Sequence, residues 1–164
     1  MDDISAEELN RRFDDLGARN NAFTSAEMTC FYASVLPERF DEMVSLLAKM
    51  MRPALRQADF DTEKGVILEE IAMYKDNPFW VLYERAMEER YTPAPGGEMH
   101  ALGHRVLGTK KSITDLSSTQ MRDYFRARYS ADNTVVAMAG RLDFDDACAE
   151  IEKFCGGWER TGAT

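Results

Sequence analysis

Histidine, cysteine and long apolar runs are scarce in this sequence. It has two histidines and three cysteines, and no apolar stretch approaches the roughly 20 residues that cross a membrane. Cys30, Cys148 and Cys155 lack the C-x-x-C spacing of paired metal and redox sites, so we interpret them as small apolar side chains in a reducing compartment. The first ten residues, MDDISAEELN, are acidic and lack the cationic and apolar parts of a secretory signal. No membrane partner is expected.

An excess of positive charge is also missing. The net charge is −9 and the pI is about 4.8, which argues against a nucleic-acid partner because phosphate binding requires a basic surface. A hydrophobic content of 45% and a charged content of 30% are typical of a globular protein. The length of 164 residues suits one domain, which we expect to span residues 1–164.

Apolar spacing, capping residues and breakers predict an α+β fold in which an antiparallel sheet is flanked by several helices. Two or three strands are few for so many amphipathic helices, so the sheet and its domain are expected to be incomplete. The predicted helices cover residues 5–17, 37–52, 59–74, 79–90, 117–129 and 143–156, and the predicted strands cover 21–35, with a turn or bulge near Ser25, and 133–139. A loop rich in proline and glycine is expected over residues 91–111.

Glu63 and Glu70 stand in the middle of an apolar pattern. At about 100° per residue, both fall inside the apolar arc of the helix over residues 59–74. That arc holds Phe60, Val66, Ile67, Ile71, Met73 and Tyr74. A carboxylate that faces a core needs a cation, a metal or hydrogen-bond donors. Either an ion pair with arginine or lysine or a functional site would meet this need.

Four segments, taken in order, together form a family pattern: SAEELNRRFDDLGARNNAFTS, FDTEKGVILEEIAMYKDNP, HALGHRVLGT and MRDYFRARYSADNTVVAMAG. They resemble the pitrilysin/insulinase family of inverted-zincin metallopeptidases, which includes the mitochondrial processing peptidases. The resemblance covers nearly the whole chain. It implies a partial pitrilysin-like half-domain from a zinc-dependent metalloendopeptidase that hydrolyses peptides or proteins.

The same resemblance implies roles for the two glutamates. Glu70 matches the family's third zinc ligand, and Glu63 matches a nearby carboxylate that orients or supports the site. The H-x-x-E-H motif, which supplies the two zinc histidines and the catalytic glutamate, is absent, so this chain holds no catalytic residue. We expect that motif shortly before Met1. Zinc is therefore expected in the complete protein and not on this chain alone, which we expect to be inactive.

The two histidines do not replace the missing motif. His100 and His104 lie in a loop with Gly96, Gly97 and Gly103, and no glutamate separates them. His100 matches a family loop that is not the zinc motif. Neither histidine is predicted to bind metal.

Substrate contact is implied for an edge strand. Asn20, Asn21, Ala22, Phe23 and Thr24 match the strand to which a substrate peptide adds in the family. An ordinary hairpin is the alternative. The family's second half, which closes over the peptide, has no counterpart in this chain, and Arg126 and Tyr129 match a surface helix instead. The expected partners are a peptide or protein substrate and the remainder of the same chain or a homologous subunit. Open sheet edges also favour self-association.

Two hypotheses follow. The chain is a segment of a zinc metalloendopeptidase, or it is a non-catalytic, peptide-binding or structural subunit of the same family. The two costly carboxylates on the apolar arc favour the first hypothesis. A generic α+β domain in which both glutamates meet arginines is a third alternative.

Overall fold

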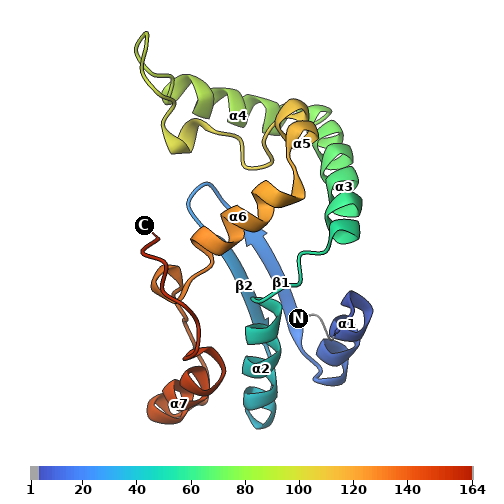
Figure 1. Cartoon of the computed structure of the whole chain (residues 1–164), viewed down its shortest axis with the longest axis vertical. Coiled ribbons are helices and arrows are strands. Elements are labelled where there is room, and N and C mark those ends of the chain that lie inside the picture. Colours follow the sequence, from blue (N-terminus) through green and yellow to red (C-terminus); the bar gives the residue numbers. More distant parts are fainter. Residues whose placement is uncertain (1–3, 164) are drawn as a thin grey trace. The chain divides into compact units, whose positions relative to one another are not determined.

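The computed structural model describes residues 4–163 and confirms the α+β class, with seven α-helices and one two-stranded antiparallel sheet in that range (Figure 1). The elements are α1 (Ala6–Asp15), β1 (Arg19–Thr24), β2 (Thr29–Ser34), η1 (Pro37–Arg39), α2 (Phe40–Met50), α3 (Gln57–Lys75), α4 (Pro78–Arg90), η2 (Ala101–Gly103), α5 (Lys110–Asp115), α6 (Ser118–Arg128), η3 (Ala131–Asn133) and α7 (Phe144–Cys155). None of the helices in the described range is long and apolar enough to span a membrane.

Two compact units divide the chain. The first comprises residues 4–22, 31–54 and 119–163, and the second comprises residues 23–30 and 55–118. The buried core of the first unit is formed by side chains from α1, α2 and the segments that flank α1. Its members are Ile4, Leu9, Phe13, Leu16, Met43 and Leu46. Phe13 is 2% exposed and lies one turn after Leu9, as the helical period requires.

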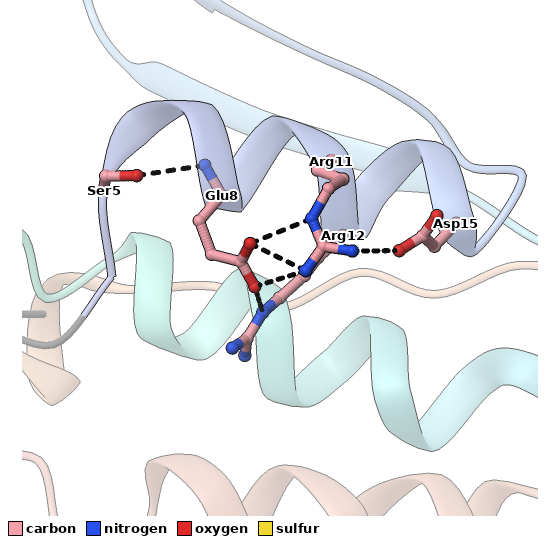
Figure 2. Close-up of polar contacts among 5 residues, drawn as sticks. All are labelled: Ser5, Glu8, Arg11, Arg12 and Asp15. Carbon is pink, nitrogen blue, oxygen red and sulfur yellow. Dashed lines mark hydrogen bonds and ion pairs between the residues drawn. The ribbon is translucent and has the colours of Figure 1, made fainter.

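Helix α1 lies within the predicted range 5–17. The Oγ of Ser5 accepts a hydrogen bond from the Glu8 N–H at 3.1 Å (Figure 2). Gly17 adopts a φ of +62° just after the helix. The Glu8 carboxylate binds Arg11 and Arg12, each at 2.8 Å (Figure 2). These bonds hold the pKa of Glu8 below its usual range.

The predicted strand over residues 21–35 is a hairpin with its turn at residues 25–28. The Ser25 N–H donates to the Met28 carbonyl at 2.8 Å and closes the turn. All six residues of β1 are exposed. In a regular ladder with this register, the backbone groups of alternate residues such as Ala22 point away from β2. The edge of β1 is therefore open in the described structure.

The prediction of a buried strand at residues 133–139 is wrong. Residues 134–139 form no ladder with any described residue, and Val135 is 93% exposed. Thr134 nevertheless has extended dihedral angles, with φ −122° and ψ 131°. The β-branched sequence selects an extended backbone, but a strand also needs a neighbour with which to exchange hydrogen bonds.

Helices α3, α4 and α5 build the second unit, in which both α4 and α5 contact α3. The Oδ1 of Asn77 caps α4 by accepting from the Phe79 N–H at 3.1 Å, and Pro78 occupies the first turn. Thr109 and Ser112 form a reciprocal capping box at the start of α5. Figure 1 shows α5 beside α3.

Candidate functional site: an open carboxylate face on helix α3

Helix α3 has a packed side and an open side. Phe60 and Ile71 are each 8% exposed and mark the packed side. About 60–100° around the helix from these two, Glu63 is exposed and Glu70 is half-buried. Their apolar neighbours on that side, Val66 and Met73, are 51% and 63% exposed. Two carboxylates thus share a solvent-facing strip with apolar side chains.

This placement corrects the expectation that both glutamates point into a core. The apolar arc exists, but the described structure covers only one edge of it. Neither Glu63 nor Glu70 has a hydrogen bond or an ion pair with any residue in the range 4–163, so the alternative of an arginine or lysine partner finds no support there. Periodicity identifies which residues share a face, whereas burial depends on what packs against it.

The residues present do not complete a metal centre. Among residues 4–163 there is no group of three histidine, cysteine, aspartate or glutamate side chains that could hold a metal ion. A catalytic zinc ion requires three protein ligands and an open position. The carboxylate of Glu70 is chemically suited to be one such ligand, and the other two would have to come from elsewhere.

An aromatic cluster, not anticipated from the sequence, lies at the corner between α3 and α4. The ring of Trp80 meets the rings of Tyr74, Phe79 and Tyr83 edge to face, with centroid distances of 5.7, 5.5 and 6.0 Å. Phe79 is 67% exposed and Tyr83 is 50% exposed. Tyr74 lies one turn beyond Glu70 on α3, so apolar surface continues from the carboxylate face to this corner. The apolar run after Pro78 was the signal that could have revealed it.

The histidine loop is held by local contacts. The Nδ1 of His100 accepts a hydrogen bond from the Leu102 N–H at 3.2 Å, and its ring stacks on Tyr91 with centroids 5.0 Å apart. His104 is exposed at the end of η2. These contacts give His100 a structural role in the loop.

An ion-pair network that sequence reasoning missed fastens the same loop to α4. The guanidinium of Arg105 contacts Glu88 at 2.5 Å and Glu84 at 3.2 Å, and all three side chains are about one-third exposed. The hydrogen bonds from Arg105 keep the pKa of Glu88 below its usual range. Charge alone could not indicate this network, because the partners are 17 and 21 residues apart in the sequence.

The five residues with predicted substrate contact all lie on β1. Asn20, Asn21, Ala22, Phe23 and Thr24 are exposed. The outward-directed N–H of Ala22 donates to the Oδ1 of Asn21 at 2.8 Å. The edge of β1 is thus accessible to an added strand. One backbone donor of this edge, the Ala22 N–H, is already bonded to the Asn21 side chain.

Comparisons with known proteins agree with the resemblance. A sequence profile described as insulinase (peptidase family M16) matches residues 2–109, and one described as the peptidase M16 inactive domain matches residues 115–164. The uncharacterized zinc protease YmxG of Bacillus subtilis is 33% identical over 159 residues, which cover 96% of this chain and 37% of that protein. This chain therefore spans little more than a third of that relative's length.

Solved structures share the fold. A protease from Helicobacter pylori superposes with a TM-score of 0.87 at 21% identity, over 96% of this chain and 37% of that one. A peptidase M16 inactive domain from Pseudomonas fluorescens gives a TM-score of 0.83 at 21% identity, over 94% and 37%. Family profiles over nearly the whole length and the shared fold lead to one conclusion. The chain belongs to the insulinase family of peptidases, peptidase family M16.

Proposed function

We propose that this chain is a segment of a zinc-dependent metalloendopeptidase that hydrolyses peptides or proteins. The observation that carries the proposal is the pair Glu63 and Glu70, seven residues apart on the open side of α3 and without a partner in residues 4–163, in a member of the insulinase family. Neither carboxylate serves a structural contact in this range, so a partner outside it best explains why both stand on an apolar strip.

Glu70 is the proposed zinc ligand. Glu63, seven residues earlier on the same helix face, supports Glu70 by orienting the groups around the zinc site. When bound, zinc would polarise a substrate carbonyl and lower the pKa of a bound water. The histidine ligands and the general base are not in this chain, so we propose that the chain by itself neither retains zinc nor hydrolyses peptides.

Two features support a peptide as the substrate. The exposed edge of β1 at Asn20–Thr24 offers backbone donors and acceptors to an added strand, which binds a peptide largely independently of its sequence. The aromatic cluster around Trp80 offers apolar surface one turn beyond Glu70. It fits a large apolar side chain of the substrate.

A non-catalytic subunit is the second candidate. The match of residues 115–164 to a profile described as an inactive domain favours it, because that profile describes a part of the family without its own chemistry. Such a subunit would bind peptide through β1 and leave catalysis to a homologous partner. It would have no need for Glu70 as a ligand.

The first test is the size and zinc content of the protein as its own cells make it. We expect an immunoblot species several times larger than 18.7 kDa, which retains zinc after extensive dialysis and cleaves an unfolded test protein. Glu70→Gln should abolish zinc retention and cleavage, whereas Glu69→Gln, an exposed glutamate outside the arc, should not. A product of 18.7 kDa without zinc, captured with a homologous subunit, would favour the second candidate.

A further inference from the structure

A single stretch of chain follows the packed side of α3 over much of its length. We call residues 105–118 the splint. At one end, the Ser118 hydroxyl donates to the side-chain oxygen of Gln57 at the start of α3. At the other, Leu107 and Gly108 line one small cavity together with Ile71 and Tyr74. The splint therefore runs antiparallel to α3, all within the second compact unit.

Lys64 makes the central contact. Its Nζ donates to the carbonyl of Thr114 at 2.6 Å and to that of Leu116 at 2.8 Å. These carbonyls lie at the C-terminal end of α5, where helix carbonyls lack partners and a cation is favoured. The ammonium also lies 5.6 Å from the centre of the buried Phe60 ring. One half-buried lysine thus joins the middle of α3 to α5.

The splint is itself held in place. Arg105 fastens its start to Glu84 and Glu88 on α4. Gly108 has a φ of +72°, and a Cβ there would meet the Ser112 Oγ at 2.8 Å, so any other residue would be strained where the chain turns into α5. Arg105 and this turn thus join the start of α5 to α4, and the carbonyls that Lys64 binds lie at the other end of α5.

The spacing of these contacts matches that of the carboxylates. Gln57, Lys64 and Ile71 recur every seven residues on the packed side, and Glu63 and Glu70 recur every seven residues on the open side. Lys64 follows Glu63 directly, and Ile71 follows Glu70 directly, so each packed contact lies about 100° around the helix from a carboxylate. Rotation of α3 about its axis would break the packed contacts of Gln57, Lys64 and Ile71, and it would also displace the two carboxylates.

We propose that Lys64 is a positioning residue, which fixes the rotation of α3 through the α5 carbonyls and so keeps Glu63 and Glu70 on the open face. The assignment rests on the proposed role of Glu70 as a zinc ligand. The contact between Lys64 and the α5 carbonyls does not depend on that role, so it can be tested without zinc.

Hydrogen exchange of the 164-residue chain tests the contact. Lys64→Met keeps the aliphatic stem and removes the ammonium. It should speed exchange of the amides around Ile67 about tenfold or more and leave α2 and α7 unchanged, because these belong to the other unit. Lys64→Arg should restore protection, and Lys110→Met, at an exposed lysine of α5, should have no effect. Unchanged exchange in α3, acceleration shared by α2 and α7, or failure of arginine to restore protection would overturn the proposal.

Zinc affinity of the protein as its own cells make it tests the positioning. Lys64→Met should weaken zinc binding about tenfold or more, as for other residues that orient a ligand, and Lys64→Arg should recover most of the loss. Equal affinity in wild type and Lys64→Met would overturn the positioning role. A wild-type protein that binds no zinc would overturn the proposed function instead, and hydrogen exchange would still decide whether Lys64 fixes α3.

Discussion

Replacing Glu70 by glutamine tests whether this residue is a metal ligand or one partner of a structural ion pair. The side chain is half-buried and has no partner within residues 4–163, and glutamine has nearly the same helix propensity. We therefore expect the free energy of unfolding to change by no more than about 0.5 kcal/mol. Loss of a partner from a buried ion pair would cost about 3–5 kcal/mol. For a chain of this length the melting temperature should move by less than about 2 °C in the first case and by roughly 6 °C or more in the second.

Urea unfolding followed by circular dichroism, together with calorimetry, measures the difference. Glu69→Gln, on the exposed side of the same helix, controls for loss of one negative charge. Glu88→Gln serves as the comparator that breaks an observed ion pair, and it should destabilise more than Glu70→Gln. A loss of about 3 kcal/mol on Glu70→Gln would refute the reasoning, because that residue would then have a structural cation as its partner.

Three further outcomes are expected. The pKa of Glu88 is lowered by its bond to Arg105, so that ion pair contributes stability above the ordinary glutamate pKa and loses it as pH falls through the lowered value. Hydrogen exchange of residues 91–109, corrected for intrinsic rates, should therefore speed up near pH 3 relative to pH 6, and constant protection would contradict this. Burial raises the pKa of the Cys155 thiol, so iodoacetamide at pH 8 should modify the exposed Cys148 several-fold faster by peptide mass analysis, and equal rates would argue against that burial. Phe13→Ala should destabilise the first unit by about 3–5 kcal/mol in urea unfolding, and a loss below about 1 kcal/mol would mean that the α1 core is not formed.

The sequence predicted what local chemistry determines. Ser5 and Asp143 cap the predicted helices over residues 5–17 and 143–156, and Pro37 begins the helical segment predicted over 37–52, because caps and proline act within one turn. The family resemblance was also confirmed, since its motifs depend on residue identity and order.

What the sequence did not reveal depends on contacts between distant residues. Residues 133–139 have the composition of a strand but lack a hydrogen-bonding neighbour in the described structure. The partners of Arg105 and Lys64 lie 17 or more residues away, so no periodic pattern signals them. The roles of Glu63, Glu70 and the β1 residues remain predictions. Spacing alone predicted that Glu63 and Glu70 share one face of α3, but not that this face is open, and the family resemblance implied the open strand.

The two seven-residue repeats on α3 restrict how this helix can change in length. Seven residues advance the helix by two turns to within about 20°, so insertion of a whole repeat would keep both faces nearly in phase. Deletion of one residue between Glu63 and Glu70 would turn everything after it by about 100° relative to Lys64. Related sequences should therefore vary in residue type on the exposed side of α3 more readily than in the number of residues between its two glutamates.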